Sequence, residues 1–217
     1  MPSSIKASDS IRPISSPSTL HSLGPACSCG TYLLRIDVTR PVRLRFGRFA
    51  GGAPIALQAG CYAYIGSAMA RKGSASLVRR ALRHATRSGQ KPPHALRGLL
   101  LEHFTHIGLC SSNRPFPMPN KTVHWHIDHL LDLERTNLHS AFFLHGEKTL
   151  ENALARLILS DAHAAAFAPG LGASDAPGQT HLLRIDSTPS WWTDISHRLA
   201  ATFSLAPFHS THAGGAK

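Results

Sequence analysis

The sequence predicts an α/β (α+β) fold, with a small, mostly antiparallel central sheet flanked by helices. Three observations support this class: several short segments alternate apolar and polar residues, other segments carry apolar residues at helical spacing, and Gly- and Pro-rich stretches separate them. The 217 residues, 42% of them hydrophobic, suffice for one core with extensions. We expect a folded domain over residues 29–186, a flexible leader over 1–28 and a tail over 187–217.

Strands are expected where apolar side chains recur at every second residue. From Tyr32 to Val38 this alternation is regular, and it follows directly on Gly30. A turn at Pro41 separates this strand from the next. The same pattern predicts further strands at residues 42–46, 61–65 (ended by Gly66), 138–144 and, as the last strand, 181–185.

One amphipathic helix is expected after Ser74 or Ser76, either of which would serve as its N-cap. Its apolar face consists of Leu77, Val78, Ala81, Leu82 and Ala85. The other side would present Arg80, Arg83, His84 and Arg87.

Further helices are expected in the second half of the chain. Residues 150–166 form the clearest of them, and residues 124–133 a second. Residues 96–104 fit a helix or a strand. The tail would hold one amphipathic helix, because Trp191, Ile195 and Leu199 are in helical register.

Composition excludes some classes of protein. The sequence lacks the roughly 18 consecutive apolar residues of a membrane span, and its first residues do not resemble a secretory signal, so we expect no membrane partner. The four cysteines form neither CxxC pairs nor a regular framework. This usage suits a reducing compartment and predicts a cytoplasmic protein.

Charge favours nucleic acid as a partner. Lys and Arg number 23 against 12 acidic residues, a net charge of +11. No acidic residue occurs between Asp37 and Glu102, a stretch that solubility alone does not require. Basic side chains bind polyanions because each neutralised phosphate releases counterions. The phosphate contacts are expected from Arg71, Lys72, Arg79, Arg83 and Arg87.

The order of two tyrosine motifs, a basic helix and a later acidic residue resembles the GIY-YIG nuclease superfamily. Gly30-Thr31-Tyr32 opens the first strand and Tyr64-Ile65-Gly66 closes a later one. The next helix carries Arg80 and, one turn on, His84. Glu151 then begins a separate helix.

The resemblance extends to one branch of that superfamily, the domain of unknown function 123, sometimes fused to endonuclease III. Five blocks in order carry it over roughly residues 29–186, and any one of them alone is weak. They are Gly60 to Ala68, Arg80 to His84, His124 to Leu131, Glu151 to Ala155, and Gly170 to Asp175 with Thr180-His181-Leu182.

The resemblance implies a metal-dependent endonuclease that hydrolyses phosphodiester bonds, with DNA favoured over RNA. Tyr32 would be the general base, and His84 would orient it or assist proton transfer. Tyr64 would position water or phosphate, and Arg80 would bind phosphate oxygens. Glu151 would hold one Mg²⁺ or Mn²⁺. The guanidinium and the metal are both expected to lower the pKa of Tyr32.

A second hypothesis is a nucleic-acid-binding module on the same scaffold without catalysis. Each site residue alone has an ordinary interpretation: Tyr32 and Tyr64 as half-buried strand residues, Arg80 as a solvated charge, and Glu151 as a partner of the helix dipole. The two hypotheses differ in the pocket. Convergence of these four residues favours the nuclease, whereas a Glu151 that points away or a Tyr32 in the core favours the binding module.

Two other sites are weaker candidates. His124, His126 and Asp128, with the adjacent His129, offer zinc-ligand chemistry, but neither a strand nor a helix brings all four side chains to one face. A zinc-binding protein is therefore the third hypothesis. Ser174, Asp175 and His181 invite a Ser/His/Asp interpretation that lacks a nucleophile elbow.

Overall fold

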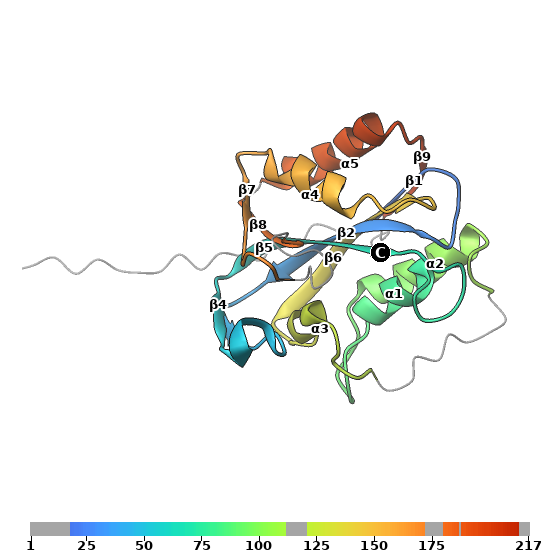
Figure 1. Cartoon of the computed structure of the whole chain (residues 1–217). Helices are drawn as coiled ribbons and strands as arrows, with labels where there is room; N and C mark the ends of the chain where they lie inside the picture. The colour runs from blue at the N-terminus through green and yellow to red at the C-terminus, as the bar shows by residue number, and fades with distance from the viewer. Residues whose placement is uncertain (1–17, 112–120, 172–179, 187, 213–217) are drawn as a thin grey trace, which may run out of the picture.

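A seven-stranded sheet forms the centre of the protein, and helices cover both of its faces (Figure 1). This computed structural model describes residues 18–111, 121–171, 180–186 and 188–212. Only β1 and β6 run parallel; every other pair in the sheet is antiparallel. The expected α+β class is therefore confirmed. In spatial order the strands are β7 (Ala164–Ala166), β8 (Leu182–Ile185), β5 (Gly60–Ala68), β2 (Gly30–Val38), β6 (Thr136–His145), β1 (Thr19–Leu23) and β9 (Pro207–His212).

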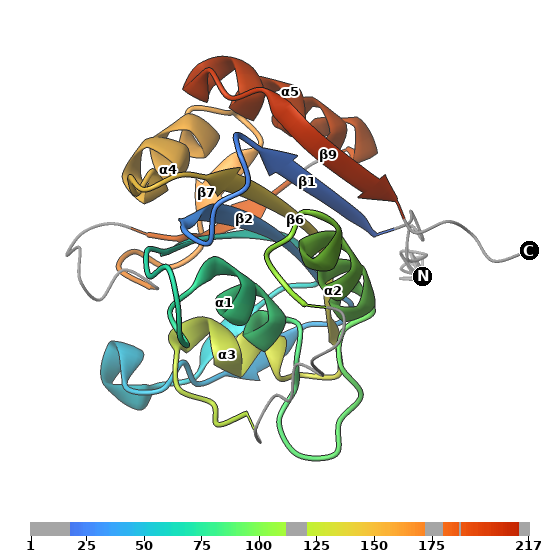
Figure 2. The same ribbon diagram turned by 90° about the vertical axis from the view of Figure 1, so that its right-hand side faces the viewer.

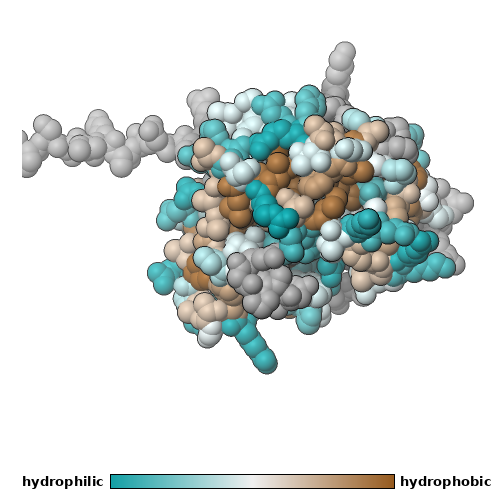
Figure 3. All heavy atoms as spheres, turned by 45° about the horizontal axis from the view of Figure 1, so that its top comes forward, coloured by the Kyte–Doolittle hydropathy of each residue, from teal (hydrophilic) through white to brown (hydrophobic). Residues whose placement is uncertain are grey.

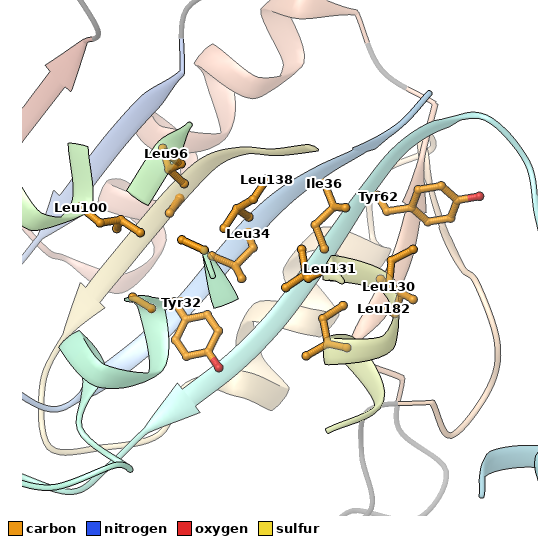
Figure 4. Close-up of a cluster of buried hydrophobic side chains, with 14 of the residues drawn as sticks. Tyr32, Leu34, Ile36, Tyr62, Leu96, Leu100, Leu130, Leu131, Leu138 and Leu182 are labelled. Atoms are coloured by element: carbon orange, nitrogen blue, oxygen red, sulfur yellow. The ribbon is translucent and has the colours of Figure 1, made fainter. Parts of the chain in front are cut away.

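Strand β2 is central because both of its edges are paired, with β5 on one side and β6 on the other. Its alternation divides the core into two clusters, one on each face of the sheet. Tyr32, Leu34 and Ile36 lie in one cluster and Leu33 in the other. Figure 4 shows the first three in a row along the strand, with leucines of the covering helices opposite them.

Helices α1 (Leu77–His84), α2 (Leu96–His106) and α3 (His126–Leu131) cover the Tyr32 face, and α4 (Glu151–Leu159) and α5 (Pro189–Phe203) cover the other (Figure 1). The expected apolar face of α1 is buried, and Ser76 is its N-cap. The predicted register of the tail helix is also confirmed, since Trp191, Ile195 and Leu199 are buried. Seen from the α4 and α5 side, hydrophobic residues gather inside a hydrophilic border (Figure 3). None of the described helices is long and apolar enough to cross a membrane.

Several boundaries differ from expectation. Strand β5 continues through Gly66 to Ala68, because Gly66 pairs with Tyr32 across the ladder. The helix expected over 150–166 ends at Leu159, where Asp161 accepts the backbone N–H of His163 and closes a turn before β7. The strand beginning at Val42 forms β3 (Val42–Leu44), which pairs with the unpredicted β4 (Ile55–Leu57) in a separate two-stranded sheet. A 3₁₀ turn, η1 (Phe49–Gly52), lies between β3 and β4.

The prediction of a flexible leader is wrong for the residues that form β1. This strand lies between β6 and β9 (Figure 2). Its Leu20 is fully buried. Likewise, the last described strand is β9 rather than the segment ending at Ile185. The reason is physical: a five-residue strand gains its order from hydrogen bonds to distant segments, and a local pattern does not report those.

Arg87, expected on the solvent side, is buried and forms hydrogen bonds to other segments of the chain. Its guanidinium donates to the backbone carbonyls of Pro92 and Thr136, both at 2.6 Å. It also donates to His94 Nδ1 at 3.2 Å, which accepts the backbone N–H of Leu138 at 3.0 Å as well. Burial without these carbonyl partners would be costly, so Arg87 is a structural residue and not a phosphate contact.

Replacing Leu20 with alanine tests the place of β1 in the core. We expect Leu20→Ala to lower the free energy of unfolding by about 2–5 kcal/mol, because it leaves a cavity at a fully buried site. Leu159→Ala is the matched control, since that leucine is 40% exposed and should change stability by less than about 0.5 kcal/mol. Chemical denaturation measures both. Equal effects would mean that β1 is not part of the core.

Histidine burial makes the fold sensitive to mild acid. Burial lowers the pKa of His94 to about 4, whereas an unfolded histidine has a pKa of about 6.5. Between these values the unfolded chain binds more protons, so stability is full above pH 6.5 and falls as the pH drops towards 4. We expect a loss of roughly 1–3 kcal/mol in urea unfolding over this window. In His94→Gln, whose side chain does not titrate, the free energy of unfolding should fall less steeply with decreasing pH.

Candidate functional site

Tyr32 is positioned by β2 so that its ring is buried and its hydroxyl reaches α1. The hydroxyl oxygen lies 2.9 Å from His84 Nε2, and both side chains are at most 2% exposed. Gly66 on β5 makes this possible, since a Cβ there would lie 2.5 Å from the Tyr32 hydroxyl oxygen. The glycine of the second tyrosine motif is thus required by the tyrosine of the first.

Tyr64 and His84 complete a group of three rings around that hydroxyl. The Tyr64 ring centroid lies 6.3 Å from that of Tyr32 and 5.9 Å from that of His84. Tyr64 is only partly buried, so it borders the buried pair on its outer side. Tyr32 belongs to one core cluster and Tyr64 packs against the same cluster, so the two rings lie on one face of the sheet.

Arg80 approaches the same group from α1. It donates a hydrogen bond of 2.6 Å to the carbonyl of Ser67, near the end of β5. Its guanidinium carbon lies 5.0 Å from the centre of the Trp125 ring. Its charge also favours the ionised form of Tyr32.

Glu151 enters from the other side of the sheet, at the first residue of α4. Thr31, adjacent to Tyr32, fixes the start of this helix by accepting the backbone N–H of Leu150 at 2.8 Å. The Glu151 carboxylate is 20% exposed and lies 3.8 Å from His181 Nδ1. Its charge disfavours the ionised form of Tyr32, so it is within electrostatic reach of the phenol.

The expected lowering of the Tyr32 pKa is wrong for the protein alone. Burial raises the pKa of Tyr32 well above its ordinary value; Tyr64 and Glu151 add to this, and Arg80 only partly opposes it. Burial also lowers the pKa of His84 to about 3. At neutral pH the pair is therefore a protonated phenol beside a neutral imidazole, within hydrogen-bond distance of each other.

Asp128 is fully buried at the start of α3 and serves as its cap. Its Oδ2 accepts the backbone N–H groups of His124 (3.1 Å) and Trp125 (3.0 Å), together with a 2.8 Å hydrogen bond from Arg83. Lys121 Nζ lies 3.4 Å from Oδ1. Burial would raise the pKa of Asp128, but Lys121, the Trp125 N–H and Arg83 hold it at about 2.

These contacts correct two expectations. Arg83 is committed to Asp128 and to the carbonyl of Thr122 at 2.6 Å, so it is not an open phosphate contact. Asp128 is likewise engaged by cations and N–H groups rather than placed as a ligand beside His124 and His126. Lys121 gave no signal in the sequence, because a buried lysine resembles any other basic residue there.

The possible metal ligands are few. Among the described residues, no group of three or more His, Cys, Asp and Glu side chains is placed to hold a metal ion. His126 lies near Phe49, with ring centroids 5.9 Å apart. Glu151 fits a different kind of site, because Mg²⁺ is often held by one or two carboxylates, with water and substrate phosphate as the remaining ligands.

Of the expected phosphate contacts, three lie on the surface. Arg71 and Lys72 are exposed after β5, where Arg71 forms an ion pair with Glu147. Arg79 is exposed on α1, beside Arg80. Exposed arginines that the prediction omitted lie around the β3–β4 hairpin: Arg43, Arg45 and Arg48.

Two further proposals fall partly outside the described residues. Ser174 and Asp175 of the Ser/His/Asp interpretation belong to the segment 172–179, as does part of the fifth motif block. His181 is described and is buried beside Glu151.

Comparison with known proteins gives one match. Residues 31–203 match a single protein family, and this range includes all five candidate site residues and continues through α5. No curated protein and no solved structure matches the chain. Because the match spans most of the sequence, the chain belongs to the family described as domain of unknown function DUF123.

Proposed function

We propose that this protein binds nucleic acid and hydrolyses phosphodiester bonds at the group formed by Tyr32, Tyr64, Arg80, His84 and Glu151. One observation carries the proposal: the hydroxyl of a buried phenol lies 2.9 Å from His84 of α1, and the ring of Tyr64 from β5 lies beside it. The charges of Arg80 and Glu151 act on the ionisation of this phenol in opposite directions. A core tyrosine needs one partner for its hydroxyl. Ionisable groups of both signs around it are typical of a reactive site.

Each residue has a chemical role in this proposal. Arg80 offers a planar fork of N–H donors to the phosphate oxygens. His84, neutral at physiological pH, lies within hydrogen-bond distance of the Tyr32 hydroxyl and would orient it. Glu151 would hold a divalent cation, Mg²⁺ or Mn²⁺, which would supply positive charge to the phosphate. Tyr64, partly exposed, would position phosphate or water.

A specific observation favours a second candidate, a binding module without catalysis. The Tyr32 ring lies in the core, and its raised pKa opposes a role as a base in the protein alone. Catalysis therefore requires added positive charge near Glu151. We place the binding module second because it does not explain why ionisable side chains surround the buried phenol of Tyr32.

The surface charge supports nucleic acid as the partner in both candidates. The acid-free stretch between Asp37 and Glu102 supplies Arg43, Arg45, Arg48, Lys72 and Arg79 as exposed cations. We propose DNA rather than RNA only from the resemblance to nucleases. The four cysteines are free thiols, which supports the cytoplasm as the proposed location.

Salt dependence tests the binding proposal. We expect the affinity for a labelled oligonucleotide to fall by roughly 0.9 log unit per log unit of salt for each duplex phosphate contact. Arg79→Ala should reduce the slope of log affinity against log salt by about the amount that corresponds to one phosphate contact. Arg156→Ala is the matched control, because Arg156 is also an exposed helical arginine but belongs to α4 on the other face. Fluorescence anisotropy across a salt series measures both. A slope of zero for the unaltered protein would contradict the proposal.

Removal of one hydroxyl tests catalysis. We expect Tyr32→Phe to remain folded and to bind nucleic acid, but to lose a factor of about 10² to 10⁴ in metal-dependent cleavage. Tyr62→Phe is the control, because it removes a buried hydroxyl on the same face that bonds only the carbonyl of Gln58 (2.9 Å). Labelled linear, flapped and branched substrates with Mg²⁺ or Mn²⁺ provide the assay. Binding without cleavage in all three proteins would favour the non-catalytic module.

A further inference from the structure

Trp125 differs from the other two tryptophans in its exposure. Trp191 and Trp192 are 7% and 5% exposed and belong to the core beneath α5, whereas Trp125 is 43% exposed at the start of α3. Indole is the largest apolar side chain, so its exposure forgoes a substantial gain in burial energy.

The exposed indole is carried by a rigid backbone. The buried carboxylate of Asp128 accepts the N–H groups of both His124 and Trp125, and Arg83 and Lys121 fix that carboxylate in turn. A buried lysine, a partly buried arginine and a buried carboxylate thus hold the first turn of α3 in place. A preorganised aromatic surface binds a ligand with little loss of conformational entropy.

The neighbours of the indole connect it to the candidate site. The Arg80 guanidinium lies 5.0 Å from its ring centre, in cation–π contact, and the His124 ring meets it edge-on at 5.2 Å. Arg80 in turn is within electrostatic reach of the Tyr32 phenol. A phosphate bound by Arg80 would have its own or the adjacent base within reach of Trp125.

We infer that Trp125 is a stacking platform for an unpaired nucleobase. The preferred substrate would therefore be nucleic acid that has a single-stranded or unstacked nucleotide beside the phosphate bound at the site. The inference rests on the proposed function and adds the class of substrate to it. A base within a regular duplex has both faces stacked on its neighbours, whereas an unpaired base offers a free face to an aromatic side chain. Such stacking is independent of base identity, because every base has a π-face.

Binding by variants of the full-length protein tests this. Trp125→Ala should weaken binding of a labelled single-stranded oligonucleotide by roughly 5- to 150-fold, the range that corresponds to one stacked base. Binding of a blunt duplex of the same sequence should change much less. Trp125→Phe keeps a platform and should retain most of the single-strand affinity. Leu159→Ala, an exposed apolar residue on the other face, is the control and should change neither affinity.

Intrinsic fluorescence provides an independent readout. Because Trp191 and Trp192 are buried, single-stranded oligonucleotide should quench only the Trp125 emission and should shield it from acrylamide. Trp125→Phe should remove both effects without preventing binding.

The outcomes separate this inference from the proposed function. If the protein binds nucleic acid but Trp125→Ala weakens single-stranded and duplex binding equally, or not at all, the stacking inference is wrong and the binding proposal stands. If the unaltered protein binds neither oligonucleotide at low salt, both are wrong, and the exposed indole is a contact for another kind of partner. Single-strand-selective loss with quenching supports the inference.

Discussion

The buried carboxylate of Asp128 is the interaction on which the rest of the candidate site depends. It accepts the backbone N–H of Trp125 at the start of α3, forms ion pairs with Arg83 of α1 and Lys121 of the preceding segment, and lies 4.0 Å from His84 Nδ1. Removing one partner of a buried ion pair typically costs about 3–5 kcal/mol, a large share of the roughly 5–15 kcal/mol of a domain's stability. The position of α3 relative to α1 is therefore set by electrostatics as much as by apolar packing. His84 and Trp125 take their places from the same group.

The sequence predicts those elements of the fold whose pattern lies within one short segment, and misses those that depend on contacts with distant segments. Three local patterns each correspond to an element of the structure. They are the alternation from Tyr32 to Val38, the apolar face beginning at Leu77, and the register of Trp191 with Ile195. Strand β1 depends on pairing with β6 and β9, and β9 on pairing with β1, so their residues carried no comparable signal. The same holds for the burial of Arg87, whose partners are backbone carbonyls that no sequence pattern reports.

The sequence proposed which residues form the candidate site, but it did not predict their ionisation. Resemblance to a family of nucleases supplied Tyr32, Tyr64, Arg80, His84 and Glu151, and the structure brings the first four together with Glu151 in electrostatic reach. Reasoning from neighbouring charges alone gave the wrong direction for the pKa of Tyr32, since burial outweighs the guanidinium. The loss of hydration depends on the depth of a side chain below the surface, and that depth is a property of the folded chain only.

The pairing of β1 with β9 has a consequence for biosynthesis. Thr19 lies opposite His212, so the first described strand acquires its second neighbour only when almost all of the described chain has been made. Until then one edge of β1 presents unpaired N–H and C=O groups, and such an edge is a template for association with other chains. Ribosomal synthesis proceeds from β1 towards β9, which makes closure of this sheet edge a late, long-range event. A product of premature termination before Pro207 would contain every candidate site residue and an open sheet edge at β1.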